Sequence, residues 1–223
     1  MRRKTLLSWS SGKDSAWTLY KLRQNPEIDL VGLFCTVNKE FNRVAMHGVR
    51  VELLQQQAES VGLPLEIIEI PYPCSNAAYE KVMSQFVETV KNDGVEHFAF
   101  GDLFLEPIRN YREEKLKDSG IQPIFPLWNT PTDTLSKEMI ASGLRTLITC
   151  IDPKKMPKTL AGLEFNEAFL RLLPKTVDPC GENGEFHSFV FDGPMFKQKI
   201  AVCVGDIVER DGFVFADVLP ESA

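Results

Sequence analysis

Residues 5–24 read TLLSWSSGKDSAWTLYKLRQ. A short apolar run ends in small polar residues after Ser8, and from Ser15 onward the apolar residues recur at the three-to-four-residue spacing of a helix. The stretch therefore predicts a strand, a tight turn at residues 10–15 and a helix. In such a turn, successive backbone N–H groups and the positive helix end converge on one point, which favours binding of an anion.

The alternation of strand and helix continues to about residue 128. Helical spacing of apolar residues separates the strand-like runs, and Gly or Pro residues end several of the helices. Further strands are expected at residues 30–36, 65–70, 98–101 and 124–128. Strands that alternate with helices predict a parallel sheet, here of five strands, so the predicted fold class is α/β.

The pattern changes beyond Trp128. A helix that Thr132 or Thr134 can cap comes first. Strand and helix signals then fall at residues 145–151, 165–172, 186–191, 199–204 and 213–218. We therefore predict one domain at residues 1–128 and a smaller α+β domain at residues 129–223.

Composition disfavours several classes of protein. The chain has 223 residues, with 25 Lys+Arg against 31 Asp+Glu and a formal net charge of −6, whereas a nucleic-acid binder usually carries a basic surface. Five cysteines without a Cys-x-x-Cys pair argue against a disulfide framework, an iron–sulfur site or a zinc knuckle. The apolar runs are too short to span a bilayer, and the N-terminus lacks a signal-peptide core, so we expect a cytoplasmic protein.

The predicted turn at residues 10–15 has the chemistry of a phosphate site. Gly12 lets the backbone approach a phosphate, the serine hydroxyls add donors, and Asp14 with Ser15 can cap the helix. A Walker A loop would need a glycine where Leu7 stands and Ser or Thr where Asp14 stands, and a dinucleotide fingerprint would need three glycines. A strand-to-helix turn that binds no ligand is the alternative.

Residues 10–15 (SSGKDS) resemble the Ser-Gly-Gly-x-Asp-Ser loop of the PP-loop ATP pyrophosphatases, which cleave ATP between the α and β phosphates. Ser11 replaces the first glycine of that loop. If this position requires a positive φ, Ser costs on the order of 1 kcal/mol relative to Gly. Such a cost is compatible with nucleotide binding.

The whole chain resembles the diphthine–ammonia ligase family and its bacterial relatives. The resemblance rests on the turn together with Met46-His47-Gly48-Val49, Gly101-Asp102 with Glu106 and Arg109, and DPCGENGEF at residues 178–186. It implies a Rossmann-like, adenine nucleotide alpha hydrolase-like sheet with a substrate-facing C-terminal domain. Known members convert a carboxylate into an acyl-adenylate that ammonia attacks, which gives the amide in the last step of diphthamide formation on a translation elongation factor.

The resemblance also implies roles for individual residues, with ATP and Mg²⁺ as cofactors and with ammonia and a carboxylate, free or on a protein, as substrates. The catalytic candidates are Lys13, Asp14, Asp102, Glu182 and Glu185. The candidates for binding ATP are Ser10, Ser11, Gly12, Lys13, Asp14, Ser15, Thr36 and His47. The candidates for binding the substrate are Glu106, Arg109 and Asn183, and the candidate Mg²⁺ ligand is Asp14.

Residue chemistry supports these assignments. The N–H groups of the loop, Lys13 and Mg²⁺ can stabilise the negative charge that develops on the α-phosphate and on the leaving pyrophosphate. Carboxylates in a pocket that holds little water can accept a proton from ammonia. Glu182 and Glu185 are the candidates for that second role.

Plainer interpretations stay open for several residues. Asp102 and Glu106 can cap the helix that follows them, Arg109 can be a solvated helix residue, and His47 can make a structural hydrogen bond. Cys180 is a nucleophile or, more simply, a free thiol. Two other functions also stay open: a PP-loop enzyme that modifies tRNA and a sensor that binds ATP or AMP without turnover.

Overall fold

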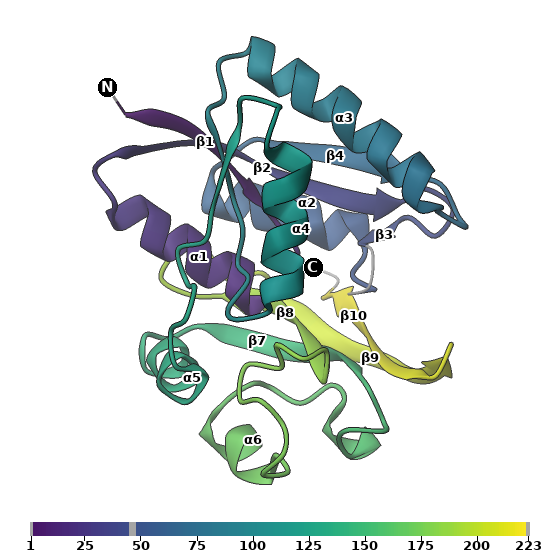
Figure 1. Ribbon diagram of the computed structural model, residues 1–223. Helices are drawn as coiled ribbons and strands as arrows, with labels where there is room; N and C mark the ends of the chain where they lie inside the picture. Colours follow the sequence, from purple (N-terminus) through teal and green to yellow (C-terminus); the bar gives the residue numbers. More distant parts are fainter. Residues whose placement is uncertain (1, 45–47, 222–223) are drawn as a thin grey trace.

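Two β-sheets organise the chain in the computed structural model, which describes residues 2–44 and 48–221 (Figure 1). The first sheet contains β1 (Arg3–Ser8), β2 (Ile28–Asn38), β3 (Arg43–Val44), β4 (Leu65–Ile70), β5 (His97–Ala99) and β6 (Gln122–Ile124). Five of these strands are parallel, as predicted, and their order, which was not predicted, is β4-β2-β1-β5-β6. The last of them lies at Gln122–Ile124 and not at residues 124–128, where it was expected. The short β3 was not predicted, and it pairs antiparallel with the end of β2.

Helices cover both faces of this sheet. They are α1 (Lys13–Gln24), α2 (Val51–Val61), α3 (Asn76–Asn92) and α4 (Glu106–Leu116). Successive side chains of a strand point to opposite faces, so Leu7 packs in a core with residues of α1 and α2, whereas Leu6 packs with residues of α3 and α4. The continuous apolar run of β2 contributes to both cores, because Leu33 packs in the first and Phe34 in the second.

The strand order places a switch point between β1 and β5. The chain builds β1, β2 and β4 outward in one direction and then returns, so that β5 pairs with β1 on its other edge. Open α/β sheets bind ligands in the crevice outside the carboxyl ends of the strands at such a point. The turn after Ser8 and the loop after Ala99 meet there.

The second sheet lies below the first in Figure 1 and is antiparallel. Its order is β8-β7-β10-β9, and its strands are β7 (Arg145–Ile151), β8 (Phe186–Asp192), β9 (Val202–Arg210) and β10 (Phe213–Pro220). The accompanying helices are α5 (Thr132–Ala141), the 3-10 turn Lys158–Leu160 and α6 (Glu167–Leu172). The two sheets share one apolar core, to which α1 and β8 both contribute. The domain boundary at residue 128 stays a prediction.

The strand expected at residues 199–204 was placed wrongly. β9 starts at Val202 and continues to Arg210, and most of its side chains are exposed because it is the edge strand of the sheet. An exposed edge strand has no apolar alternation to reveal it. Asp211 and Gly212, both with positive φ, form the turn into β10.

Two sequence expectations concern the surroundings of the protein. Within the described ranges, none of the helices combines the length and apolar character that crossing a membrane requires. All five cysteines are free thiols.

Candidate active site

A cavity of about 890 Å³ opens at the switch point. It receives side chains from the turn after β1, the end of β2, the loop after β5 and the segment before β8. The predicted residues that line it are Ser10, Gly12, Lys13, Asp14, Ser15, Thr36, Asp102 and Glu182. Residues more than 160 positions apart in the sequence therefore share one site.

The turn at residues 10–15 is held by its own hydroxyls and by β8. The Ser15 hydroxyl donates to the Gly12 carbonyl at 2.9 Å, and the Ser10 hydroxyl donates to Ser15 Oγ at 3.1 Å. The Lys13 amide donates to the Ser188 hydroxyl at 3.2 Å. The N-cap of α1 is Gly12, with no side chain capping the helix, so the expectation that Asp14 caps it was wrong.

Ser11 has a φ of +67°, the conformation that a glycine adopts most readily. Its side chain is buried, and its hydroxyl makes no hydrogen bond within the described residues. Its carbonyl accepts from the Val190 amide at 3.0 Å and from Gln57 Nε2 at 3.0 Å. These contacts hold the turn against β8. They therefore offset the cost of about 1 kcal/mol that a positive φ imposes on Ser11.

Lys13 and Asp14 form an ion pair at the inner wall of the cavity. Lys13 Nζ lies 2.7 Å from Asp14 Oδ2, and only 3% of the Lys13 side chain is exposed. Burial alone would lower the pKa of the Lys13 ammonium, but the charge of Asp14 and its hydrogen bond, with the charge of Glu182, raise that pKa above its ordinary value. Lys13 is therefore a fixed positive charge beside the turn.

Asp14 keeps one oxygen unused. Burial raises the pKa of the Asp14 carboxyl, and the adjacent Lys13 partly offsets that shift. Oδ2 pairs with Lys13, whereas Oδ1 is buried without a hydrogen-bond partner in the part of the chain described. That oxygen fits a Mg²⁺ ion that takes its other ligands from water and phosphates, as Mg²⁺ commonly does. No cluster of three or more His, Cys, Asp or Glu side chains suited to a metal ion occurs among the described residues.

The segment before β8, residues 178–185, is an ordered loop that we call the tail loop. Asp178 organises it, because Asp178 Oδ2 accepts from the amides of Cys180 and Glu182 at 3.1 and 3.0 Å. The Thr132 hydroxyl donates to Asp178 Oδ1 at 2.5 Å, which fixes the loop to the start of α5. The loop therefore presents Glu182 to the cavity in a defined position.

Glu182 reaches across to the loop after β5. Its Oε1 accepts a hydrogen bond from the Leu103 amide at 2.8 Å and a longer one from the Phe104 amide at 3.4 Å. Burial raises the pKa of the Glu182 carboxyl to about 7, with a smaller upward contribution from the charge of Asp14. A carboxyl group that titrates near neutral pH can take up and release protons under physiological conditions.

Glu185 and Asn183 point elsewhere. Glu185 is 3% exposed, and its Oε1 accepts from the Asp178 amide and from Asn183 Nδ2, each at 3.1 Å. Neither side chain lines the cavity. The structure therefore gives Glu185 a role in holding the tail loop and separates it from Glu182.

Asp102 lies in the cavity, but its partner is a residue that sequence reasoning missed. Arg112 binds both carboxylate oxygens of Asp102, at 2.6 and 3.1 Å, and its guanidinium lies 4.1 Å from the centre of the Phe100 ring. Arg112 and Ile108 both line the cavity and lie four positions apart, on the same face of α4. This helical spacing is the signal by which the sequence could have indicated Arg112.

Glu106 and Arg109 do not line the cavity. Glu106 is exposed at the start of α4. The Arg109 guanidinium stacks on Phe125 and Trp128 and pairs with Glu113 at 2.7 Å. His47 lies outside the described residues.

Two residues near Lys13 that the site prediction did not include are Ser188 and His187, and Cys180 lies close to them. Ser188 supports the Lys13 amide, and His187 lines the cavity with a pKa that burial and the Lys13 charge lower to about 4. At neutral pH the His187 imidazole is therefore uncharged. Cys180 is buried, and burial raises the pKa of its thiol, which agrees with the interpretation of a free thiol and not an activated nucleophile.

The strand order and the crevice at its switch point define a Rossmann-like α/β protein with a second, antiparallel sheet. Residues 3–123 match the family described as "Diphthamide synthase N-terminal domain", and residues 132–215 match "Diphthamide synthase C-terminal domain". The chain therefore belongs to the diphthamide synthase family.

Named relatives agree with that assignment. The chain is 30% identical over 164 residues to a diphthine–ammonia ligase of Mus musculus, and the aligned region covers 70% of this chain and 61% of the mouse protein. It is 29% identical over 165 residues to the Homo sapiens enzyme of that name, with 70% and 61% covered. A third relative, from Danio rerio, is 28% identical over 179 residues, with 72% and 69% covered.

Proposed function

We propose that this protein is an ATP-dependent ligase that converts a carboxylate into an amide with ammonia, through an acyl-adenylate. The observation that carries the proposal is the convergence of Lys13, from the phosphate-type turn, and Glu182, from the tail loop, on one cavity. The relatives are named diphthine–ammonia ligases, so the proposed substrates are ATP, ammonia and a diphthine-like carboxylate.

The first step joins the carboxylate to the nucleotide. A carboxylate oxygen attacks the α-phosphorus of ATP, the bond to the β-phosphate oxygen breaks, and pyrophosphate leaves. Lys13 and the turn at residues 10–15 would stabilise the negative charge that develops on these phosphates. Asp14 would hold Mg²⁺ through its free Oδ1, and the ion would supply further positive charge.

The second step forms the amide. The ammonia nitrogen attacks the acyl carbon, the bond from that carbon to the AMP oxygen breaks, and AMP leaves with one oxygen of the original carboxylate. The attacking nitrogen must lose a proton, and Glu182, with a pKa of about 7, is the group that would accept it.

Asp102 and Arg112 would shape the opposite wall. Their paired hydrogen bonds fix the Asp102 carboxylate at the carboxyl end of β5, close enough to Asp14 for its charge to raise the Asp14 pKa. The remaining predicted substrate contacts, Glu106, Arg109 and Asn183, stay predictions for a protein substrate that extends beyond the cavity.

The direct test is transfer of nitrogen. The protein is incubated with ATP, Mg²⁺, ¹⁵N-ammonium and an elongation factor that carries unamidated diphthine, and the modified peptide is analysed by mass spectrometry. We expect one ¹⁵N atom in the amide, dependent on ATP and lost in Lys13→Ala. A peptide that gains no ¹⁵N while ATP is hydrolysed in response to tRNA would instead support the tRNA-modification alternative.

A further inference from the structure

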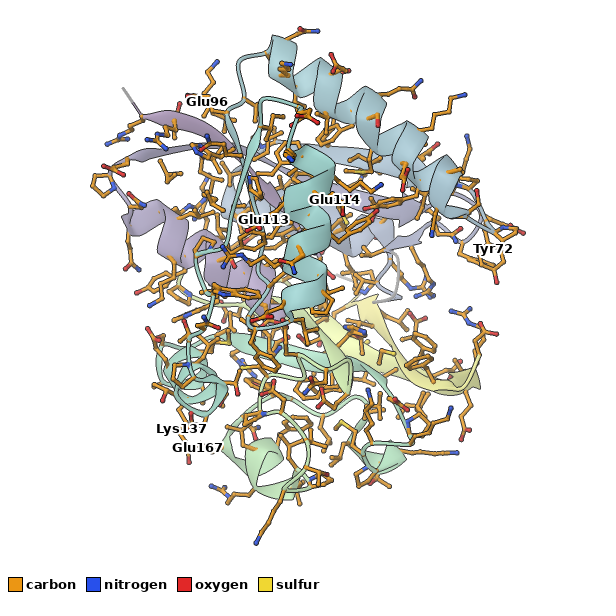
Figure 2. The ribbon with its side chains drawn as sticks, viewed as in Figure 1. Tyr72, Glu96, Glu113, Glu114, Lys137 and Glu167 are labelled. Atoms are coloured by element: carbon orange, nitrogen blue, oxygen red, sulfur yellow. The ribbon has the colours of Figure 1, made fainter. Side chains whose placement is uncertain are left out.

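Gln57 is a polar residue on the apolar face of α2. Side chains fill the space between the two sheets in Figure 2, and α2 contributes to this shared core through Val51, Leu53, Leu54, Ala58 and Val61. Gln57 lies among them and is fully buried, whereas Gln55 on the same helix is exposed. Burying an amide costs free energy unless the protein replaces its hydrogen bonds with water. The position therefore indicates that the Gln57 amide makes specific contacts.

The Gln57 amide joins three segments of the chain. Its Oε1 accepts a hydrogen bond from the indole Nε1 of Trp9 at 2.9 Å. Its Nε2 donates to the carbonyl oxygens of Ser11 at 3.0 Å and of Val190 at 2.6 Å. Two acceptors face the nitrogen and a donor faces the oxygen, so the orientation of the amide is defined. Gln57 therefore connects the end of β1, the turn at residues 10–15 and β8.

The bond to Ser11 fixes the peptide plane between Ser11 and Gly12. In a trans peptide the C=O and N–H groups point in opposite directions. The Ser11 carbonyl points to Gln57 and to the Val190 amide, so the Gly12 N–H points away from them. That N–H makes a long hydrogen bond of 3.4 Å to the Ser10 hydroxyl, and both Ser10 and Gly12 line the cavity. Holding the Ser11 carbonyl therefore directs the Gly12 N–H to the side on which an anion would bind.

We propose that Gln57 is a positioning residue of the ligase reaction, which orients the Gly12 N–H toward the phosphates of ATP. Gln57 does not line the cavity, so it acts through the turn and not on the substrate. The positive φ of Ser11 gives this contact a purpose, because a serine does not readily adopt that conformation unaided. The Val190 amide is a second anchor for the Ser11 carbonyl, so loss of Gln57 should weaken nucleotide binding without abolishing it.

A purely structural role is the alternative, and the two roles differ in their kinetics. A structural residue affects the fraction of folded protein, which lowers kcat and leaves the Kd for ATP unchanged. A positioning residue raises that Kd and slows the exchange of labelled pyrophosphate into ATP. The KM for ammonia should stay the same, because Glu182 is held by Leu103 and Asp178, and Gln57 contacts neither of these residues.

The experiment replaces the Gln57 amide with side chains of similar size. Gln57→Met removes all three hydrogen bonds. Gln57→Glu keeps the acceptor for Trp9, and its protonated form can donate to one of the two carbonyl oxygens, whereas its ionised form repels both. Burial and these oxygens raise the pKa of the introduced carboxyl above its ordinary value. An indole and backbone carbonyls do not titrate near neutral pH. Gln55→Glu makes the same change on the exposed face of α2 and is the matched control.

The Kd for ATP with Mg²⁺ is measured between pH 5.5 and 9 as a ratio of variant to unmodified protein, so that titrations common to both proteins cancel. Gln57→Met should raise the Kd about 10-fold at every pH, because the Gly12 N–H is less well placed. Gln57→Glu should stay within about 3-fold while the introduced carboxyl is protonated and should reach about 10- to 100-fold once it ionises. Gln55→Glu should leave the Kd unchanged.

Trp9 reports the ionisation at position 57 without any reference to activity. The chain has three tryptophans, so ¹⁵N labelling of the indoles gives three N–H signals, and Trp9→Phe identifies the signal of Trp9. Ionisation of the introduced carboxyl should move that signal to lower field, because hydrogen bonds to charged acceptors are stronger. The Kd ratio of Gln57→Glu should rise over the same pH range as this shift. While the Trp9 signal shows a neutral carboxyl, the ratio should stay low.

Two results would overturn the proposal: a Kd ratio near 1 in Gln57→Met, or a change in the Kd of Gln57→Glu that does not follow the Trp9 signal. Urea unfolding checks that the variants fold, and lowered stability with an unchanged Kd would assign Gln57 the structural role. Should Gln57→Met not fold, Gln57→Glu at acid pH restores one donor and provides the test.

The inference rests on the proposed function for its reaction, but the two fail in different ways. Nucleotide binding that depends on Gln57, without ¹⁵N incorporation into the amide, would reject the ligase function alone. Amidation by the unmodified protein together with Kd values that do not respond to Gln57 would reject the positioning role alone.

Discussion

Glu182 and Leu103 are joined by a hydrogen bond of 2.8 Å between a tail-loop carboxylate and a backbone amide in the loop after β5. The bond connects the antiparallel sheet to the carboxyl end of the parallel sheet, where Lys13 and Asp14 also lie. Burial at this junction is what brings the Glu182 pKa to about 7. The proposed base therefore depends on both halves of the chain.

Glu182→Gln should lower the rate of amide formation by about 10²- to 10⁴-fold, because the variant cannot accept a proton from the attacking nitrogen. Formation of the acyl-adenylate should persist, measured as carboxylate-dependent exchange of labelled pyrophosphate into ATP. Glu185→Gln is the matched control in the same loop. Its amide oxygen can replace Glu185 Oε1 as acceptor for Asp178 and Asn183, so we expect activity close to that of the unmodified protein. Equal losses in both variants would contradict the assignment.

The rate of amidation should depend on the ionisation of Glu182. After correction for the fraction of ammonia that is uncharged, the rate should fall as the pH drops through about 7, because a protonated Glu182 cannot act as a base. Glu182→Gln should show no such inflection. A profile with the same inflection in both proteins would assign the titration to another group.

Stability should respond to the same group. Because the pKa of Glu182 is higher in the folded protein than its ordinary value of 4.5, the folded state binds the extra proton, and stability falls as the pH rises from about 4.5 through 7. Above that range Glu182→Gln should be more stable than the unmodified protein by about 2 kcal/mol, a value reduced for the partial exposure of the side chain. Below pH 4.5 the difference should vanish. Urea unfolding at pH 4 and pH 8 measures it, and a pH-independent difference would count against the raised pKa.

Arg112→Lys should be costly although it conserves charge. Lysine can replace neither the two hydrogen bonds to Asp102 nor the stacking on Phe100, and the Asp102 side chain is only 14% exposed. We expect a loss of about 2 kcal/mol in the free energy of unfolding and a raised KM for ATP. Arg109→Lys, three residues earlier on α4, also loses stacking, on Phe125 and Trp128. It should still cost no more than about 1 kcal/mol, because the Arg109–Glu113 side chains are 35% and 44% exposed and a lysine can keep that ion pair. Similar losses of stability in the two variants would contradict the claim that the contacts of Arg112 contribute more to stability than those of Arg109.

Ser11→Gly tests the conformation of the turn. Glycine relieves the cost of a positive φ, so the free energy of unfolding should stay constant or rise by up to about 1 kcal/mol. Ser11→Val should lower it by about 2 kcal/mol or more, because a β-branched residue fits neither that φ nor the buried site. Denaturant unfolding measures both variants. A destabilised Ser11→Gly would mean that the hydroxyl makes an essential contact.

Much of the parallel half could be predicted from the sequence. Its strands and helices carry strong apolar periodicity, and the SSGKDS turn sits where one strand must become a helix. Contacts that depend on tertiary packing could not be predicted, among them the Arg112–Asp102 pair and the separation of Glu182 from Glu185. Two glutamates three residues apart look equivalent in sequence, and only the fold of the tail loop turns one to the cavity and the other into the loop.

The acyl-adenylate is tested most directly by following a carboxylate oxygen. A substrate labelled with ¹⁸O in its carboxylate is amidated in the presence of ATP and ammonia, and the phosphorus products are examined by ³¹P NMR and mass spectrometry. Attack of the carboxylate on the α-phosphorus predicts pyrophosphate and AMP that carries one ¹⁸O atom. Release of ADP together with ¹⁸O-labelled inorganic phosphate would show activation at the γ-phosphate and would contradict the account.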